Sequence, residues 1–457
     1  MEWNLLRKNT FNLLKFFLLT RWRFKNWNVA QIQKYQQKQL QKLINYSIKH
    51  SRFYADFYEG YNSSDFLNLP FMNKLLYMDN FSTLNTKGLT KEECIEYCLA
   101  VEQSRDFSQY YKGFLIGMST GTSGNKGIEF ATKIETFLMQ YLVYRRFPFP
   151  KARKYHLAFI LRVFSPGFSH NGVKLRISYV SPLNSIDNIV SQLNQLHPNL
   201  LSGPPSILQI LAKARVEEKL ILNPLLVISY GEVLSPEVKA ILSRDFECPI
   251  MEVYKSSESL MAISCKHGKL HLNEDTSFIE VLDQNMKSVL PGNPGFVVVS
   301  DFIKHGTPII RYQLNDLITV DQEKCSCGSN FRVIKQVHGR ADDVIIGQVI
   351  DKEEYQLILP DYIRRSIVRS SNLIEEYNAV QNSPLELSIM LQIKSSIPKL
   401  TEIKEEIEKS ITSNIDNIFS QHGCEKPQIN YQYGNLTHDF NSKLRRIRRN
   451  FESNYFK

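Results

Sequence analysis

Residues 117–127 read GMSTGTSGNKG, a run rich in glycines and hydroxyls that ends in Lys-Gly. Its glycines allow successive backbone N–H groups to converge on one anion, its hydroxyls add donors, and its lysine offers a mobile counter-charge for a polyphosphate. The candidate phosphate-binding residues are Ser119, Thr120, Gly121, Thr122, Ser123, Gly124 and Lys126. The stretch lacks the paired Gly-Lys-Ser/Thr ending of a P-loop, so we do not expect that fold. Taken alone, it could also be a flexible turn.

The bulk composition is that of a folded enzyme-sized chain. Its 457 residues suit a large domain plus a smaller one. The formal net charge of +10 suits an anionic partner, but charge alone does not choose among nucleotide, acidic lipid and nucleic acid. We expect no nucleic-acid partner. The seven cysteines are odd in number and mostly scattered, which favours a reducing compartment and a cytoplasmic protein.

An apolar stretch at residues 11–20 is interrupted by Lys15 and followed by several cations, so it is too short to span a membrane. It also lacks the basic start, apolar middle and small-residue cleavage site that follow one another in a signal peptide. The aromatic and basic residues up to Trp27 could make a peripheral contact with an anionic membrane. Docking of an amphipathic helix on its own domain is the alternative that we favour.

From about residue 100, short apolar runs alternate with helical patterns, which predicts an α/β domain with largely buried strands. An earlier helix is expected from about residue 28 to just before Ser51, and Ser235 with Pro236 marks a helix start. The expected strands are 156–164, 225–231, 295–302 and 308–312. The expected helices are 134–147, 188–196, 205–218 and 236–244.

The pattern changes after Gly339 to charged helical stretches at 351–370 and 400–419, a strand at 428–433 and a very basic end. We therefore divide the chain into domains 1–339 and 340–457.

Four further segments, together with the opening loop, resemble the motifs of adenylate-forming ligases in the order of that family. They are SYGEVLSPEV (229–238), VYKSSES (253–259), RYQLNDL (311–317) and HGRADD (338–343). The resemblance implies a large multi-layer adenylation domain and a small C-terminal α+β lid domain. It also implies roles for single residues: Gly231 and Glu232 at the nucleotide pocket, Tyr254 beside the adenine, Ser257 on phosphate, Glu258 on Mg²⁺, Asp316 on the ribose hydroxyls, Arg340 near ribose and phosphate, and Asp342 at the hinge. Carboxylates suit these roles because they accept two hydroxyl donors and offer hard oxygens to magnesium.

Within that superfamily, HLNEDTSFIEVLD (271–283) and the following residues resemble the phenylacetate–CoA ligase and coenzyme F synthetase branch. In particular, they resemble its members associated with capsule and cell-surface polysaccharide genes. The resemblance covers most of residues 30–345.

A cysteine knuckle, Cys325 and Cys327, follows Cys265 and His271 in the sequence. Three thiolates and one imidazole would make a closed, structural zinc site, which relatives in this branch carry. His267 is an alternative to His271 as the fourth ligand. Two unrelated pairs of reduced cysteines are the other interpretation.

The family also uses a lysine near the C-terminus, in a Gly-Lys context, against the reacting carboxylate and α-phosphate. Lys443 in FNSKLRRIRRNF resembles it, although Ser442 replaces the glycine. The alternative is that this run is only a solvated basic tail.

The reaction that the resemblance implies joins Mg²⁺-ATP and a small carboxylic acid into an acyl-adenylate, with release of pyrophosphate. Transfer to a thiol, of CoA or of a carrier protein, then follows. After Asp343 the chain lacks the glycine-containing turn usual in thioester-forming relatives, so the first step is better supported. The alternatives are an amine acceptor in cell-surface polysaccharide synthesis and a catalytically silent nucleotide-binding relative.

Overall fold

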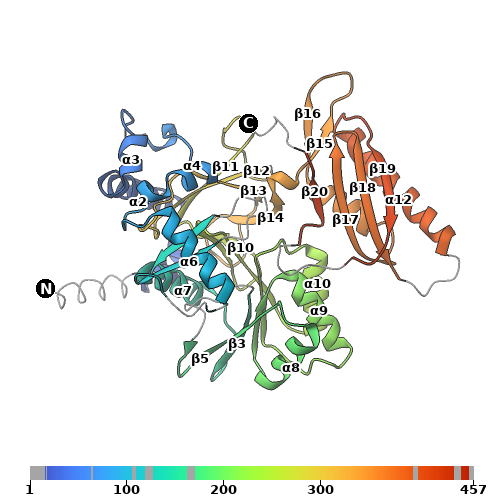
Figure 1. The fold of residues 1–457 in the computed structure, drawn as a ribbon, viewed down its shortest axis with the longest axis horizontal. Coiled ribbons are helices and arrows are strands. Elements are labelled where there is room, and N and C mark those ends of the chain that lie inside the picture. Colours follow the sequence, from blue (N-terminus) through green and yellow to red (C-terminus); the bar gives the residue numbers. More distant parts are fainter. Residues whose placement is uncertain are drawn as a thin grey trace.

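The structure is a computed structural model that describes residues 16, 18–62, 65–104, 106, 110–118, 127–161, 170–394, 400–436 and 444–451. The centre of the large N-terminal part is a sheet of 12 strands in the order β11-β12-β13-β14-β10-β9-β8-β7-β6-β3-β5-β4 (Figure 1). One half of this sheet is parallel and the other half is antiparallel.

The parallel half is built from strands that alternate with helices. It contains β3 (Tyr155–Ile160), β5 (Leu175–Val180), β6 (Leu200–Gly203), β7 (Leu226–Tyr230) and β8 (Ile250–Lys255), with β4 (His170–Asn171) antiparallel at its edge. The connecting helices are α8 (Ile186–Leu196), α9 (Pro205–Val216) and α10 (Pro236–Phe246). Because the strands are parallel, their carboxyl ends meet at one edge of the sheet.

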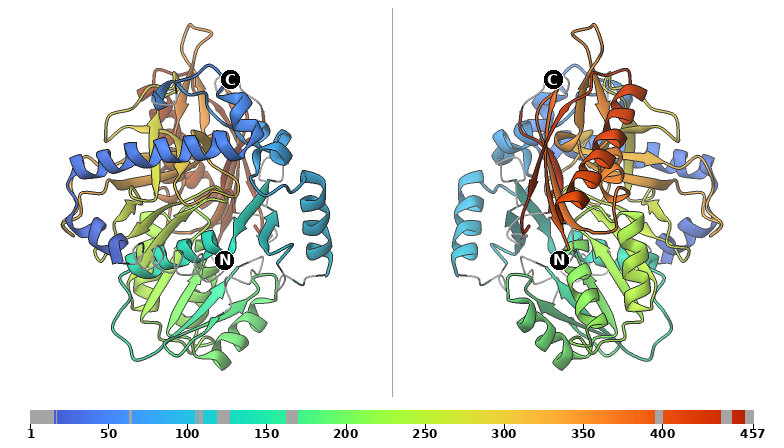
Figure 2. Two further views of the ribbon diagram at one scale, coloured as in Figure 1. Left: turned by 90° about the vertical axis from the view of Figure 1, so that its left-hand side faces the viewer. Right: turned by 90° about the vertical axis from the view of Figure 1, so that its right-hand side faces the viewer.

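The antiparallel half joins the parallel half at β8, which is parallel to β7 and antiparallel to β9. It contains β9 (Leu260–Ser264), β10 (Leu270–Leu272), β11 (Ser277–Leu282), β12 (Pro294–Asp301), β13 (Tyr312–Val320) and β14 (Val333–Arg340). Helix α2 (Val29–His50) runs across this half (Figure 2, left) and buries Leu40, Leu43 and Ile44. The remaining early elements are α3 (Arg52–Phe57), η1 (Phe66–Asn68), α4 (Lys74–Asp79), α5 (Phe81–Leu84), α6 (Lys91–Ser104), the hairpin of β1 (Phe114–Met118) and β2 (Ile128–Thr132), and α7 (Lys133–Arg146).

The C-terminal part follows the short helical turn η3 (Ala341–Asp343) and has its own hydrophobic core (Figure 1, right). Its four-stranded sheet has the order β19-β18-β17-β20 and is covered by α12. The elements are the hairpin of β15 (Ile345–Gln348) and β16 (Tyr355–Ile358), α11 (Pro360–Val368), β17 (Ile374–Ser383), β18 (Glu386–Ile393), α12 (Leu400–Gln421), β19 (Gln428–Tyr433) and β20 (Ile447–Arg449).

The α/β fold predicted from the sequence is confirmed, but two predicted elements are wrong. Residues 351–359 are not helical, because Asp351 has a positive φ of 59° and Pro360 holds Leu359 in extended backbone, so α11 begins only at Pro360. Residues 308–311 are not a strand, since β13 begins at Tyr312. The predicted start of α10 is correct: the Ser235 side chain accepts a hydrogen bond from the N–H of Val238.

The N-terminal aromatic segment packs on the large part where the structure describes it. The ring of Phe24 lies edge-on to His271 and Phe331, at centroid distances of 5.1 and 5.5 Å. Arg23 lies over the rings of Trp27 and Tyr35. These contacts favour docking of the segment on its own domain. No helix among the described residues has both the length and the hydropathy needed to cross a membrane.

Arg311 fixes the start of β13 through a buried ion pair. Its guanidinium donates to both carboxylate oxygens of Glu280, at 3.2 and 2.9 Å, and to the carbonyl of Leu69 at 2.6 Å. The side chains of Arg311 and Glu280 are only 5% and 6% exposed. Burial raises the pKa of Glu280, and the Arg311 guanidinium opposes that shift. The pair therefore ties β11 to the first residue of the motif RYQLNDL.

We expect Arg311→Met to lower the free energy of unfolding by about 3–5 kcal/mol, because it leaves the Glu280 carboxylate buried without its charged partner. The double variant Arg311→Met/Glu280→Met should recover part of that loss. Denaturant unfolding followed by tryptophan fluorescence measures both. A single variant as stable as the wild type would contradict this account.

Candidate active site

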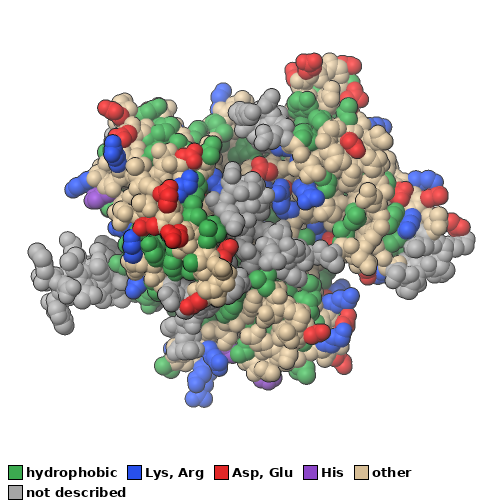
Figure 3. Space-filling model, in the orientation of Figure 1, with side chains coloured by type: hydrophobic (Ala, Val, Ile, Leu, Met, Phe, Trp, Pro, Cys, Tyr) green, Lys and Arg blue, Asp and Glu red, His purple; other side chains and the backbone are tan. Residues whose placement is uncertain are grey.

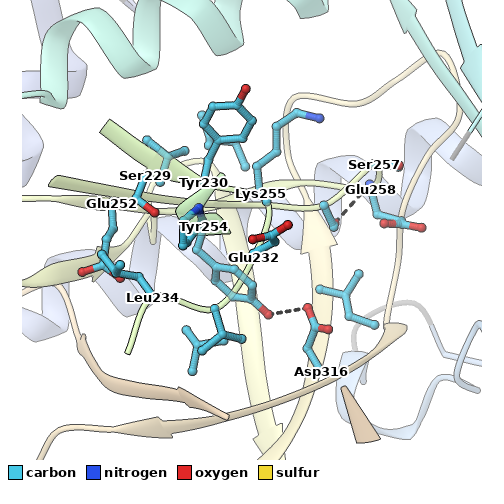
Figure 4. A pocket seen from close by; sticks show the side chains of 18 of the residues that line it. Ser229, Tyr230, Glu232, Leu234, Glu252, Tyr254, Lys255, Ser257, Glu258 and Asp316 are labelled. Atoms are coloured by element: carbon cyan, nitrogen blue, oxygen red, sulfur yellow. Dashed lines mark hydrogen bonds between the residues drawn. The ribbon is translucent and has the colours of Figure 1, made fainter. Parts of the chain in front are cut away.

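Two loops leave the carboxyl ends of β7 and β8 and open on a cavity of about 2490 Å³ (Figure 4). The first begins with Gly231, whose φ of 82° is in the region that favours glycine. The second begins after Lys255 and carries Ser257 and Glu258, next to Tyr254 near the end of β8. The cavity is lined by Gly231, Glu232, Tyr254, Ser257, Glu258, Asp316 and Arg340, all of which the sequence motifs predicted as site residues. The fold therefore brings four separate motifs to one place.

Asp316 is the centre of this arrangement. It lies directly opposite Arg340 in the pairing of β13 with β14, and the Arg340 Nε lies 3.3 Å from an Asp316 carboxylate oxygen. The hydroxyl of Tyr254 donates to the other oxygen at 2.7 Å (Figure 4). A carboxylate has about four lone-pair sites, so one such group can accept several hydrogen bonds at once.

The surroundings of Tyr254 and Arg340 fix the protonation states of both side chains. Burial raises the pKa of Tyr254 well above its ordinary value, and the negative charge of Asp316 adds to that shift. The phenol therefore remains a neutral donor. Burial alone would lower the pKa of Arg340, but the carboxylates of Asp316 and Glu258 outweigh it and raise that pKa. The site thus holds a fixed cation between two carboxylates.

The turn after β8 orients Glu258. The Ser256 hydroxyl accepts hydrogen bonds from the N–H groups of Glu258 and Ser259, each at 3.2 Å. The buried ammonium of Lys304 donates to the carbonyl of Ser257. Glu258 also acts on the hydroxyl of Tyr312, whose pKa is raised first by burial and then by that carboxylate. The Glu258 carboxylate is thereby presented to the cavity as a hard oxygen ligand.

Glu232 has a structural task that its motif did not reveal. Helix α9 follows Pro204, whose side chain cannot cap it. The Glu232 carboxylate fills that role, because it accepts from the N–H and the hydroxyl of Ser206 at 3.1 and 3.0 Å. The same carboxylate accepts from the N–H of Leu444 at 3.4 Å. Glu232 thus links the cavity to the C-terminal part.

The candidate hinge residues Asp342 and Asp343 are contacted by one side chain from the large part and one from the C-terminal part. Asn315 donates to the carboxylate of Asp342 at 2.6 Å, and Arg445 pairs with Asp343. Across the boundary, Arg364 of α11 pairs with Glu237 of α10 at 2.6 Å. Lys and Arg side chains gather on the surface between the large and C-terminal parts (Figure 3).

The remaining predicted residues lie outside the described part of the chain. They are the phosphate-loop residues Ser119, Thr120, Gly121, Thr122, Ser123, Gly124 and Lys126, and the candidate catalytic Lys443. The described residues next to them, Met118, Gly127 and Leu444, end at or near the cavity: Met118 and Leu444 line it, and Gly127 is followed by its lining residue Ile128.

Lys74 is a cation of this site that the sequence motifs missed. It is the first residue of α4 and lines the cavity. Burial lowers its pKa, while its surroundings include the opposite charge of Glu258 and the like charge of Arg340. The sequence signals the helix start at Asn73 but not the position of Lys74 beside a carboxylate that is far away in the chain.

A second group of side chains has the composition of a metal site. One ligand atom from each of Cys265, His271, Cys325 and Cys327 lies within 4.8 Å of all the others. His267 is not in this group, and its side chain is exposed. Of the two alternatives for the fourth ligand, the geometry therefore selects His271.

The spacing within the group fits a tetrahedral zinc ion. With Zn–S bonds of about 2.3 Å and Zn–N bonds of about 2.0 Å, a tetrahedron has edges of about 3.8 Å between sulfurs and about 3.5 Å between sulfur and nitrogen. The Cys265 and Cys325 sulfurs are 3.7 Å apart, and the Cys327 sulfur is 3.4 Å from Nε2 of His271. Nδ1 of His271 lies 2.9 Å from the carbonyl of Phe331, a contact that would fix the ring with Nε2 toward a metal.

Comparison with known proteins gives two curated relatives, while no family model matches the sequence. Protein CapK of Staphylococcus aureus is 22% identical over 387 residues, which cover 81% of this chain and 80% of that protein. Phenylacetate-coenzyme A ligase of Thermus thermophilus is 23% identical over 307 residues, which cover 63% of this chain and 67% of that protein.

Solved structures share the fold. The structure of 2-hydroxyisobutyryl-CoA ligase in the postadenylation state with 2-HIB-AMP has a TM-score of 0.70 at 17% identity, covering 95% of this chain and 92% of that chain. The anthranilate CoA ligase AuaEII with anthranoyl-AMP has a TM-score of 0.51 at 13% identity, covering 69% and 62%. The chain is thus similar in sequence to CapK and to a phenylacetate-coenzyme A ligase, and it shares its fold with CoA ligases whose structures contain an acyl-adenylate.

Proposed function

We propose that the protein uses ATP to convert a carboxylic acid into an acyl-adenylate with release of pyrophosphate, and then transfers the acyl group to a thiol. The observation that carries this proposal is the convergence of Tyr254, Glu258, Asp316 and Arg340 on one cavity at the carboxyl ends of β7 and β8. Ligands of α/β sheets bind at that edge.

Each residue of the cavity would have a separate task. Asp316 would accept the ribose hydroxyls, Tyr254 would lie beside the adenine, and Arg340 would hold ribose and phosphate. Glu258 would be the protein ligand of Mg²⁺, which when bound neutralises phosphate charge. Ser257 would contact phosphate from the same turn.

The residues outside the described part complete this proposal. The loop from Ser119 to Lys126 would bind the triphosphate, and Lys443 would contact the acid carboxylate and the α-phosphate. Support for Lys443 comes from its neighbour Leu444, whose N–H donates to Glu232 at the cavity.

We further propose that residues 340–457 form a lid that rotates about Asp342 between the two steps. The TM-score to 2-hydroxyisobutyryl-CoA ligase is 0.70 in its postadenylation state and 0.56 in its thioesterification state, so the present arrangement is closer to the former. Rotation would have to break the ion pair of Arg364 with Glu237.

For the acceptor, a thiol of CoA or of a carrier protein is the leading candidate, supported by the CoA ligases among the relatives. An amine acceptor in cell-surface polysaccharide synthesis is the second candidate, supported by the similarity to CapK. The segment after Asp343 forms the hairpin β15–β16, whose turn at residues 349–354 has no glycine. We place both steps in the cytoplasm, in accord with seven cysteines that form no disulfide.

We also propose that Cys265, His271, Cys325 and Cys327 hold a structural zinc ion. All four positions of the tetrahedron would be taken by the protein, which leaves none for water. The ion would tie the turn before β10 to the loop before β14.

Exchange of labelled pyrophosphate into ATP tests adenylation directly. We expect exchange only when the right acid from a panel of aryl, fatty, amino and sugar acids is present. Asp316→Asn should raise the KM for ATP about ten- to hundredfold, because a charged hydrogen-bond acceptor is lost. If no acid supported exchange while ATP still bound, the protein would be a catalytically silent nucleotide-binding relative. Dependence of product formation on CoA or on an amine then identifies the acceptor.

Lys443→Ala should lower the exchange rate by about a hundredfold or more and leave ATP binding nearly intact, because the lysine acts on charge that develops during the reaction. Arg448→Ala is the matched control, since Arg448 is an exposed cation of the same basic run. Equal exchange rates for Lys443→Ala and Arg448→Ala would show that Lys443 has no catalytic role and belongs to a solvated basic tail.

Metal analysis of the purified protein should find about one zinc per chain. The double variant Cys325→Ser/Cys327→Ser should lose the metal and unfold at a lower temperature. His267→Ala is the control and should keep the zinc, because His267 lies outside the ligand group. Zinc that survives the cysteine changes would contradict the assignment.

A further inference from the structure

An ion pair lies inside the proposed active-site cavity without a task in the reaction described so far. It joins Lys255, the last residue of β8, to Glu129 of β2, with 2.9 Å between the Lys255 Nζ and a Glu129 carboxylate oxygen. Both side chains line the cavity and are about one third exposed, at 36% and 33%. The pair is therefore accessible to a ligand.

The direction of Lys255 separates it from the ribose side of the cavity. Neighbouring residues of a strand point to opposite faces. In Figure 4, Tyr254 points toward Asp316, whereas Lys255 extends to the other side, where the ring of Tyr230 lies. If the ribose occupies Asp316, the side lined by Tyr230 and Lys255 is the part of the cavity that would be left for the acyl end of an acyl-adenylate.

That side of the cavity is largely aromatic and aliphatic. The ring of Tyr230 stacks on Phe159 with centroids 5.2 Å apart and planes 5° from parallel. Further apolar lining comes from Leu157 of β3 and Ile177 of β5. A charged amino group beside such a region gives a ligand a specific polar contact.

Within the described part of the chain, the ammonium of Lys255 has donors left for a ligand. It carries three N–H groups, and among the described residues Glu129 is its hydrogen-bond partner. The charge of Lys255 is already balanced by Glu129, and Glu258 lies close enough that both carboxylates act on the hydroxyl of Tyr77. A second carboxylate on the substrate would add negative charge here, so a neutral oxygen is the better partner.

We propose that Lys255 is a specificity-determining residue that donates a hydrogen bond to a hydroxyl of the acyl group, and that the substrate is a hydroxy acid. This inference rests on the proposed adenylation. Glu129 holds the ammonium in place, and the hydroxyl takes one of its remaining donors. An acid of the same shape without the hydroxyl leaves that donor unpaired, which disfavours it by about ten- to hundredfold in kcat/KM.

Pyrophosphate exchange with matched acids tests this assignment. The pairs are phenylacetate with mandelate and with 3-hydroxyphenylacetate, butyrate with 2-hydroxybutyrate and with 3-hydroxybutyrate, and octanoate with 3-hydroxyoctanoate. In the wild type, kcat/KM should favour the hydroxy acid at least about tenfold in one pair. Lys255→Met should bring that ratio close to one while the unsubstituted acid is still exchanged.

Two further variants separate recognition from mere strand pairing. Lys174→Met removes another lysine that lines the cavity, and it should keep the preference in kcat/KM for the hydroxy acid. The reversed pair Lys255→Glu/Glu129→Lys keeps a link between β2 and β8 but moves the ammonium, so it should lose the ratio. The inference would be wrong if the wild type showed a kcat/KM ratio near one for every pair, or if the ratio were unchanged in Lys255→Met or in the reversed pair. The proposed adenylation would stand in either case. No exchange with any acid would overturn the proposed adenylation and this inference with it.

Discussion

The site depends on the position of β8, which is hydrogen-bonded in parallel to β7 and antiparallel to β9. The parallel side brings the ends of β7 and β8 to one edge, so that the loop beginning at Gly231 lies beside the end of β8, where Tyr254 is. The antiparallel side leads through β9 and β10 to β14 and β13, which carry Arg340 and Asp316, and the Tyr254 hydroxyl reaches the Asp316 carboxylate.

The Asp316 carboxylate joins these two halves chemically. It receives the Tyr254 hydroxyl from the β8 side and pairs with Arg340 across β13 and β14. Arg340 is also the last residue before the turn Ala341–Asp343, where the chain leaves the large sheet. A nucleotide on Asp316 would therefore bind beside the proposed hinge, which is the physical basis for coupling the chemistry to rotation of the lid.

Sequence patterns predicted what is local and missed what is long-range. The cap at Ser235, the alternation of buried strands with helices and the cysteine knuckle have local signatures, and the motif order led to Asp316 and Arg340. The charged residues 351–359 favoured a helix, yet Pro360 and the positive φ of Asp351 exclude it. Lys74 beside Glu258, and the pairing of Lys255 with Glu129, depend on contacts between distant segments that no local pattern carries.

The central claim is that the cavity at the carboxyl ends of β7 and β8 is an adenylate site. A crystal structure of the protein with AMP tests it most directly, because AMP needs no knowledge of the acid. The account predicts both ribose hydroxyls within hydrogen-bond distance of the Asp316 carboxylate, the adenine beside Tyr254 and the phosphate on the side of Arg340 and Glu258. AMP bound away from Asp316, or not bound at all at millimolar concentration, would contradict it.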